Sequence, residues 1–263
     1  MLGAYLTWTF TRTLWEWGGR EPALFIAAIL LAALAVGAIG ALIEIVLLRR
    51  IYRAPELFQL LATFGVVLMI QDIALAVWGP EDLPLPRPPW LRRFVEIAGS
   101  RFPRYDLILI FVGPAVLGLL WFLFQRTRFG VLVRAATQDR EMVAALGVDQ
   151  RVLFTGVFFL GSTLAGLGGG IIACTTLHVT PLLSYWTHSG ELVFIAILGG
   201  GGSVVGPYLG AVVYELVRVY AAAAFPDGWQ MILGAVLLLI ILFAARGLWG
   251  IYEDVVLRKG RRA

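Results

Sequence analysis

A long apolar run at residues 23–48 constrains the fold of this chain more than any other feature. A helix needs about 20 predominantly apolar residues to cross the hydrocarbon core of a bilayer, and this run is long enough to do so. Similar runs follow along the chain, at residues 57–78, 106–124, 152–176 and 229–245. The sequence therefore predicts an all-α fold, a polytopic transmembrane helical bundle in which residues 1–263 form a single transmembrane domain.

The amino-acid composition supports a membrane protein. Apolar residues make up 60% of the chain and charged residues 14%, whereas about 25% of the residues of a soluble domain are charged. These values exclude an intrinsically disordered chain and argue against a soluble α/β enzyme. The single cysteine, Cys174, excludes a disulfide scaffold and a cysteine-based metal cluster. The net charge of +4 suits basic cytoplasmic loops, so we expect contact with membrane lipid and not with nucleic acid.

The positions of the basic residues predict the orientation of the chain, because cytoplasmic loops are enriched in arginine and lysine. The segments 49–56 and 125–151 and the tail from Arg246 onward together carry 13 of the 21 basic residues. We therefore place these three segments in the cytoplasm, together with the C-terminus. The polar, proline-rich segment 79–105 then lies on the outer side and does not cross the membrane.

Residues 191–225 form the irregular part of the predicted bundle. The segment before them lies outside and the last span must also start outside, so this piece must leave and return to the same side. About 35 residues are too few for two full-length helices and a turn. Helix-breaking residues stand at the centre, and they are Gly199, Gly200, Gly201, Gly202 and Ser203, followed by Gly206.

This pattern predicts a broken, re-entrant helix. A short helix would run to about Leu198, a glycine turn would follow, and a longer helix would start at about Val205. Irregular backbone at membrane depth survives only when it is buried in protein or lines a water-filled path, so we predict a translocation path here. A plain kinked helix is the alternative.

Small residues repeat every four positions in three predicted helices. They are Ala33, Gly37 and Ala41, then Ser162, Gly166 and Gly170, and finally Gly206 and Gly210. This spacing places them on one helix face, where two helix backbones can approach closely. The pattern predicts tight helix packing and does not identify a function, since it is common to most polytopic proteins.

Three polar side chains lie in or near the predicted spans: Glu44, Gln71 and Asp72. A carboxylate at membrane depth is a candidate functional group by default. Glu44 lies about one turn from Arg49 and can pair with it. Asp72 lies deeper, so Gln71 and Asp72 are the intramembrane polar candidates. The alternative is that both only make hydrogen bonds that support packing.

The cytoplasmic segment 125–151 contains a predicted short amphipathic helix. Thr137 is expected to cap this helix, with Asp139 and Glu141 in its first turn and Gly147 as its end. One face of the helix is apolar and consists of Leu132, Ala135, Ala136, Met142, Val143 and Leu146. The other face is polar and carries Arg134, Gln138, Asp139 and Arg140. Such a helix can dock in a groove of a partner protein or lie on lipid, and its acidic residues favour a protein partner.

The sequence points to no catalytic or metal site. A phosphate-binding loop needs Gly-Lys-Ser/Thr, but the only lysine, Lys259, is followed by glycine, so the chain cannot itself be a P-loop ATPase. His178 and His188 lie in one outer loop without the spacing of a zinc motif. The segment 201–204 loosely matches the Gly-x-Ser of intramembrane serine proteases, which need a histidine beside the serine. We expect no enzyme activity and no metal or cofactor bound by this chain, with the protease as an alternative.

Several segments resemble one known family in matching order along residues 2–252. They are Leu61–Gly65 followed by Gln71, the stretch RAATQDREMVAALGVDQRV from Arg134 to Val152, AILGGGGSVVGPYLGA from Ala196 to Ala211, and Arg246–Gly250. They are similar to the permease subunits of branched-chain amino acid ABC importers, in particular the H-type permease. The segment WQMILG at Trp229 is also similar to the sister M-type permease.

The resemblance implies a transport function and a set of partners. It implies a multi-pass permease of the bacterial inner membrane that pairs with a second homologous permease subunit. Two ATP-binding subunits would grip the cytoplasmic segment, at Arg134, Thr137, Gln138, Asp139, Arg140, Glu141, Ala145, Leu146 and Gly147. An external solute-binding protein would deliver the substrate.

Two questions stay open at this point. The substrate could be a branched-chain or other amino acid, an amide or urea, and the permease pair could be homo- or heterodimeric.

The alternative function is an ion-coupled secondary transporter that uses Asp72 and Glu44.

The N-terminal segment allows two interpretations. In the family, a Gly-Ala-Tyr such as Gly3–Tyr5 follows about two helices, whereas here it stands at the start of the chain. This predicts that Met1 is an internal methionine of a longer reading frame. The alternative is a short, tilted first helix over residues 2–18.

Overall fold

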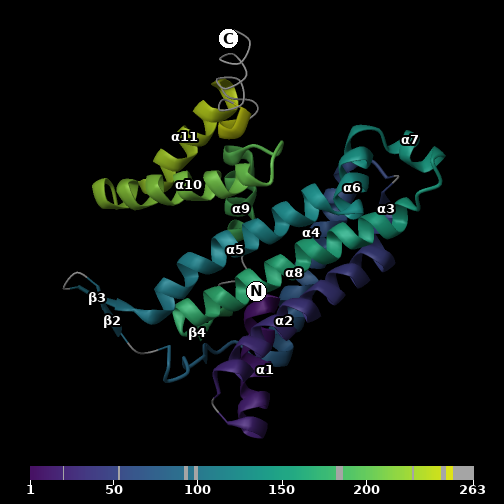
Figure 1. Ribbon diagram of the computed structural model, residues 1–263. Helices are drawn as coiled ribbons and strands as arrows, with labels where there is room; N and C mark the ends of the chain where they lie inside the picture. Colours follow the sequence, from purple (N-terminus) through teal and green to yellow (C-terminus); the bar gives the residue numbers. More distant parts are fainter. Residues whose placement is uncertain are drawn as a thin grey trace. The chain divides into compact units, whose positions relative to one another are not determined.

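The computed structural model describes residues 1–19, 21–52, 54–91, 94–97, 100–181, 186–226, 228–243 and 247–250. The described chain consists mainly of α-helices with a few short strands (Figure 1). In chain order the elements are α1 (Leu2–Gly18), α2 (Pro22–Ile43), the π-helical turn η1 (Glu44–Leu48), α3 (Arg49–Ile51), α4 (Glu56–Trp78), β1 (Leu83–Pro84), β2 (Phe94–Ile97), β3 (Ser100–Pro103), α5 (Arg104–Arg126), α6 (Arg128–Gln138), α7 (Arg140–Ala145), α8 (Gln150–Thr176), β4 (His178–Val179), α9 (Trp186–Gly199), α10 (Val205–Ala224) and α11 (Trp229–Phe243).

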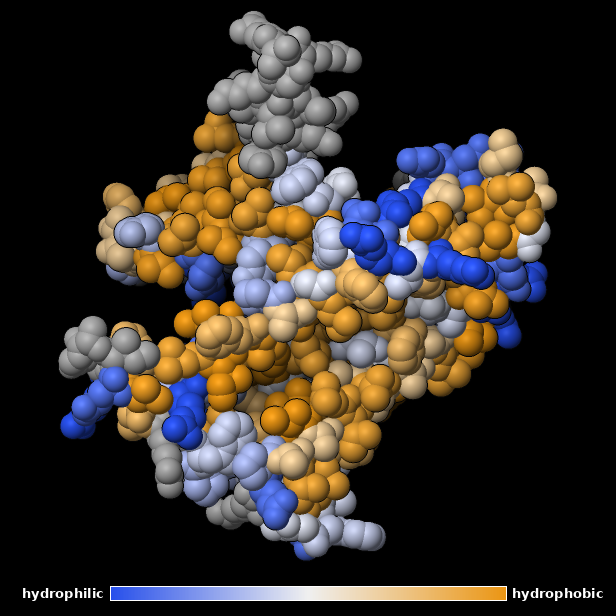
Figure 2. Space-filling view, in the orientation of Figure 1, coloured by the Kyte–Doolittle hydropathy of each residue, from blue (hydrophilic) through white to orange (hydrophobic). Residues whose placement is uncertain are grey.

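Within the described residues, four helices are long and apolar enough to cross a membrane. They are Pro22–Ile51, Leu57–Trp78, Arg104–Arg126 and Gln150–Thr176. Each coincides with a span predicted from the sequence, so the all-α polytopic bundle is confirmed. The last predicted span, residues 229–245, is the shorter apolar helix α11, and residues 244–246 lie outside the described part. Figure 2 shows hydrophobic residues over much of the visible surface, as expected where lipid or partner helices cover it.

The chain divides into two compact units. Residues Met1–Phe111 and Thr127–Tyr185 form the first, and residues Val112–Arg126 and Trp186–Ala263 form the second. Helix α5 therefore contributes residues to both units. The first unit contains most of segment 125–151, and the second contains the glycine-rich break.

Helices α2 and α8 form the core of the first unit and lie side by side (Figure 1). Their backbones approach through small residues. A β-carbon on Gly37 would overlap the Thr163 hydroxyl, and one on Gly166 would press on the backbone of Ala33. The four-residue spacing of small residues in these two helices thus marks a close helix contact, as predicted.

Helix α1 packs against the same helix, α8. Gly3 lies so close to the backbone of Gly166 that a β-carbon on Gly3 would overlap it. Tyr5 stacks on Trp78 of α4, with ring centroids 5.0 Å apart. The helix over residues 2–18, one of the two interpretations of this segment, is present.

The proline-rich segment 79–105 is anchored to the C-terminal end of α8. Strand β1 pairs antiparallel with β4, which directly follows α8. Arg87 donates from Nε to the carbonyl of Cys174 (2.8 Å) and from Nη2 to that of Thr175 (2.9 Å), and its guanidinium lies 4.4 Å from the ring centre of Tyr105. The last carbonyls of a helix lack intrahelical donors, so a cation is favourable there. Where they are described, residues 79–103 form short strands and loops without a helix, as expected for a segment that does not cross the membrane.

Candidate functional site

The predicted helix break is present in the second unit. Helix α9 ends at Gly199 and helix α10 begins at Val205. Gly200 has a φ of 92°, a conformation that L side chains rarely adopt, and it starts the turn between the helices. The break is therefore confirmed at the residues the sequence indicated, while its re-entry into a membrane stays a prediction.

The glycines of the break do not have equal roles. A β-carbon on Gly199 would overlap the backbone of Gly206, and one on Gly206 would overlap the carbonyls of Gly199 and Gly200. Gly210 lies equally close to the backbone of α9. Around Gly201 and Gly202, by contrast, no described residue places an atom within 4 Å of such a carbon. Only some members of the glycine run thus hold α9 against α10.

Ser203 serves as a local cap at this turn. Its Oγ accepts a hydrogen bond from the backbone N–H of Val205 at 3.1 Å, at the first turn of α10. This contact satisfies one of the N–H groups that a helix start leaves without a partner. His188, at the start of α9, instead lies 3.5 Å from the carboxylate of Glu191.

Sequence reasoning missed Gly247 as part of this region. Gly247 has a φ of 68°, and a β-carbon on it would overlap the backbone of Gly200. The chain after α11 therefore returns to the glycine turn. The signal that could have found it is the segment 246–250, which carried the family resemblance but was given no role.

A cavity of about 260 Å³ lies beside the break, between α9, α10 and α11. Its wall is mostly apolar and includes Phe194, Leu198 and Trp229, with Glu191 and Tyr214 as polar members. No local pattern in the sequence indicates this cavity, because its walls come from three separate helices.

In the first unit, the segment predicted to be cytoplasmic forms two helices, α6 and α7, rather than one. Asp139 stands between them in an extended conformation (φ −146°) and caps α7, because its Oδ1 accepts from the N–H of Met142 at 2.9 Å. The prediction that Thr137 caps this helix is wrong. Thr137 lies in the last turn of α6 and donates to the carbonyl of Arg134. Gly147, with a φ of 82°, follows the end of α7 as predicted.

The break at Asp139 also divides the predicted apolar face. Leu132, Ala135 and Ala136 on α6 are half-buried, and Val143 on α7 is buried. Met142 and Leu146, however, are 58% and 76% exposed. The prediction of one continuous apolar face is therefore wrong. Asp139 is extended, so the chain changes direction between α6 and α7.

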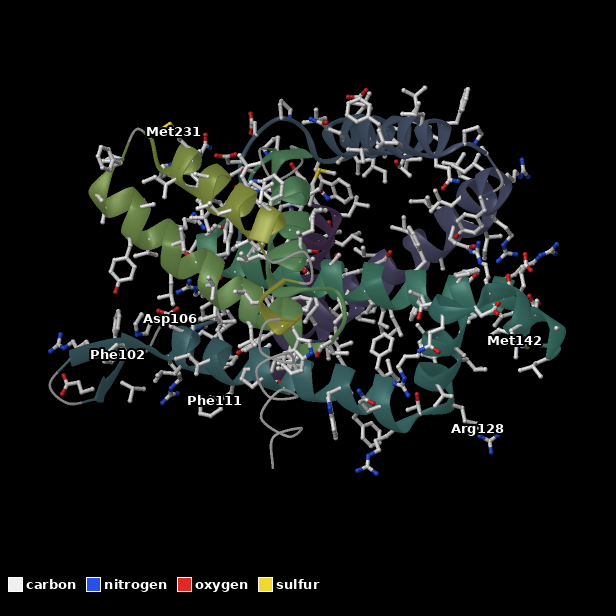
Figure 3. The ribbon with its side chains drawn as sticks, turned by 90° about the horizontal axis from the view of Figure 1, so that it is seen from above. Phe102, Asp106, Phe111, Arg128, Met142 and Met231 are labelled. Carbon is white, nitrogen blue, oxygen red and sulfur yellow. The ribbon has the colours of Figure 1, made fainter. Side chains whose placement is uncertain are left out.

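All the residues of this segment that were predicted to contact ATP-binding subunits are exposed. They are Arg134, Thr137, Gln138, Asp139, Arg140, Glu141, Ala145, Leu146 and Gly147. Figure 3 shows Met142 projecting from α7, and Figure 2 shows hydrophobic and hydrophilic residues next to each other over α6 and α7. A small exposed apolar surface surrounded by charges is suited to a protein partner.

The polar residues predicted to lie within the membrane have different environments in the structure. Gln71 is half-buried on α4, whereas Asp72 is exposed on the same helix. Glu44 is fully buried and lies 3.2 Å from Arg49, so the pairing predicted from their spacing is confirmed. Asp72 and Glu44 therefore have opposite environments, although both are carboxylates in apolar helices.

Comparison with known proteins identifies the family. Residues 1–242 match the model of the family described as branched-chain amino acid transport system / permease component. The chain is 22% identical over 256 residues to the high-affinity branched-chain amino acid transport system permease protein LivH of Salmonella typhimurium, which covers 95% of this chain and 82% of that protein.

Other relatives agree with this match. The chain is 25% identical over 257 residues to the corresponding permease protein BraD of Pseudomonas aeruginosa, with 95% and 83% covered. It is 27% identical over 149 residues to the probable branched-chain amino acid transport permease protein LivH of Methanocaldococcus jannaschii, with 53% and 43% covered. No solved structure matches the chain. The chain is an integral membrane protein and belongs to the family of permease components of branched-chain amino acid transport systems.

Proposed function

We propose that this chain is a permease subunit of an ABC importer that moves branched-chain or other apolar amino acids across a bacterial inner membrane. The observation that carries the proposal is the family match over residues 1–242, which includes both the cytoplasmic segment and the helix break. The relatives LivH and BraD are named for the transport of branched-chain amino acids, which is why apolar amino acids are the proposed substrates.

The cytoplasmic segment is the proposed contact with two ATP-binding subunits. On and directly beside the six-residue helix α7, Met142 and Leu146 expose apolar side chains. Charged residues lie next to them at Asp139, Arg140 and Glu141. A groove on the partner would take the apolar side chains, while the surrounding charges would select the partner and the orientation. ATP would be bound by the partner subunits alone, and this chain would bind no cofactor.

A second homologous permease subunit is the proposed cover for the exposed faces of the spans. Only 6% of the apolar window of α4 is buried within this chain, and Asp72 is exposed on that helix. A carboxylate facing lipid is unfavourable by a few kcal/mol, so Asp72 is expected to face a subunit interface or a water-filled path. This supports an arrangement in which two permease subunits form the translocation path together.

The helix break is the proposed moving part of that path. A solute-binding protein would release the substrate at the outer segments 79–105 and 177–190. ATP binding by the partner subunits would shift α7, and the α9–α10 hairpin around Gly199–Ser203 would change its position in alternating access. The C-terminus and the segment 125–151 would lie in the cytoplasm, on the side of the ATP-binding subunits.

Reversing charge at the cytoplasmic segment tests the docking step. We expect Asp139→Arg combined with Ala145→Asp to abolish uptake and to abolish co-purification of the ATP-binding subunits, while the chain still inserts into the membrane. The control is Glu16→Arg on α1, an exposed carboxylate outside this segment. Full uptake by the double variant would contradict the docking role.

A further inference from the structure

The carboxylate of Glu44 is the most deeply buried charge among the described residues, with no exposed surface. Thr155 donates from Oγ1 to Glu44 Oε2 (2.5 Å) and Arg49 donates from Nη2 to the same oxygen (3.2 Å). Tyr52 donates from its hydroxyl to Oε1 (3.2 Å). A buried carboxylate requires such donors, because an unpaired charge in an apolar surrounding is strongly unfavourable. Glu44 therefore joins the end of α2 to α8 through Oε2, the acceptor of Thr155, while its Oε1 is held by Tyr52 from the same segment.

The backbone at Glu44 is unusual. Residues Glu44–Leu48 form a π-helical turn inside an otherwise α-helical span, and such turns are rare and often found at functional sites. An apolar cavity of about 270 Å³ lies beside the turn and is lined by Ile43, Leu48 and Phe158, among others. Interiors of proteins are normally close-packed, so the space next to this turn leaves it room to change its packing.

The hydrogen bonds around Glu44 also leave one donor unused. Within the described part of the chain, Nε of Arg49 is buried and has no acceptor. Buried donors normally have partners, and an exception calls for a physical reason. The Glu44 cluster thus keeps one buried donor without an acceptor, which distinguishes it from a fully satisfied packing network.

A line of side-chain contacts joins Glu44 to α7. The guanidinium of Arg140, the first residue of α7, lies 4.2 Å from the ring centre of Phe154 on α8. Phe154 in turn meets the ring of Tyr52 edge to face, with centroids 5.9 Å apart. The Tyr52 hydroxyl completes the line at Glu44. Burial, and then the neighbouring Glu44 carboxylate, raise the pKa of Tyr52, so its hydroxyl stays a donor at neutral pH.

We propose that Glu44 is a positioning residue for ATP-coupled transport. It ties α2 to α8 at the π-helical turn, so that a movement of α7 reaches both helices through Arg140, Phe154 and Tyr52. This inference rests on the proposed function, in which partner subunits move α7. It adds a residue in the membrane-embedded part of the chain that converts that movement into a joint shift of α2 and α8.

The test measures coupling rather than transport alone. The complete transporter, with its ATP-binding and solute-binding proteins, is reconstituted in proteoliposomes, and the ratio of ATP hydrolysed to amino acid taken up is measured. We expect Glu44→Gln to raise this ratio about tenfold, because hydrolysis continues while uptake falls. The matched control is Glu16→Gln on α1, which removes an exposed carboxylate that is also paired with an arginine, Arg12, at 3.5 Å, and leaves the ratio unchanged.

Further variants keep the test decisive if Glu44→Gln does not fold. Thr155→Val removes one donor to Glu44 at nearly constant volume, and Tyr52→Phe removes another; each is expected to raise the ratio, and Thr155→Ser to restore it. An unchanged ratio in the folded variants overturns the inference, as does a parallel loss of hydrolysis and uptake. If the wild-type transporter itself shows no ATP-dependent uptake, the proposed function fails, which is a distinct result.

Discussion

The backbones of Gly199 and Gly206 touch each other, and this contact closes the hairpin formed by α9 and α10. A β-carbon on Gly199 would overlap the carbonyl of Gly206. A β-carbon on Gly206 would overlap the carbonyls of Gly199 and Gly200. The contact therefore depends on the absence of a side chain at both positions. It separates the glycines that shape the break from those that merely lie in it.

This contact predicts different effects for neighbouring glycine substitutions. Gly206→Ala is expected to destabilise the hairpin by about 1–3 kcal/mol, which is the usual cost of overpacking. It is also expected to reduce uptake strongly. Gly201→Ala, where no described residue lies within 4 Å of the added carbon, is the control and is expected to keep uptake and thermal stability. Equal losses in both variants, measured as uptake per inserted protein, would contradict this account of the hairpin.

A second prediction concerns the cap of α7. Asp139→Ala removes the acceptor of the Met142 N–H and is expected to destabilise α7 by about 1 kcal/mol, which weakens the binding of the ATP-binding subunits. Asp139→Asn keeps a capping oxygen, so its α7 amides should stay as protected as in the wild type. Thr137→Ala should have no effect on α7, since Thr137 bonds within α6. Hydrogen exchange of the α7 amides checks these expectations, and a loss of protection in Thr137→Ala would refute them.

A third prediction concerns the contact between α1 and α8. Gly3→Ala would place a methyl group against the backbone of Gly166, so we expect a loss of stability of at least about 1–3 kcal/mol. Gly168→Ala on α8 is the control, because among the described residues no atom lies within 4 Å of its new carbon. Thermal unfolding in detergent measures both. A Gly3→Ala protein as stable as Gly168→Ala would show that α1 does not dock here.

A fourth prediction concerns the anchor of segment 79–105, which we propose to lie on the outer side. Arg87→Ala removes the hydrogen bonds to the Cys174 and Thr175 carbonyls and the contact with Tyr105, so the loop before β2 is expected to become more accessible to protease. Arg87→Lys should restore only part of the protection, because lysine has no planar fork to reach both carbonyls. Limited proteolysis from the outer side measures this, and identical cleavage of all three proteins would disprove the anchor.

The sequence predicted the features that depend on local pattern. The spans follow from apolar runs, and the break follows from a run of glycines that no helix of this kind tolerates well. The pairing of Glu44 with Arg49 follows from a spacing of about one turn. Each of these needs only residues that are neighbours along the chain.

The features that the sequence could not supply depend on distant contacts. Gly199 and Gly201 are equivalent as glycines and differ only because α10 folds back on one of them. Thr155 lies 111 positions from Glu44 along the chain, so the sequence around Glu44 does not indicate this hydrogen-bond donor. The choice of Asp139 over Thr137 as a cap was a competition between two good capping residues, and the extended backbone at Asp139 decided it.

The central claim is that an external energy source, ATP hydrolysed by partner subunits, drives this permease. Its most direct test is uptake of radiolabelled leucine into proteoliposomes that contain the purified transporter. We predict uptake only when ATP, the ATP-binding subunits and the solute-binding protein are all present, with no response to an imposed proton or sodium gradient. Gradient-driven uptake by the permease without ATP or those partners would contradict the account and would identify an ion-coupled transporter instead.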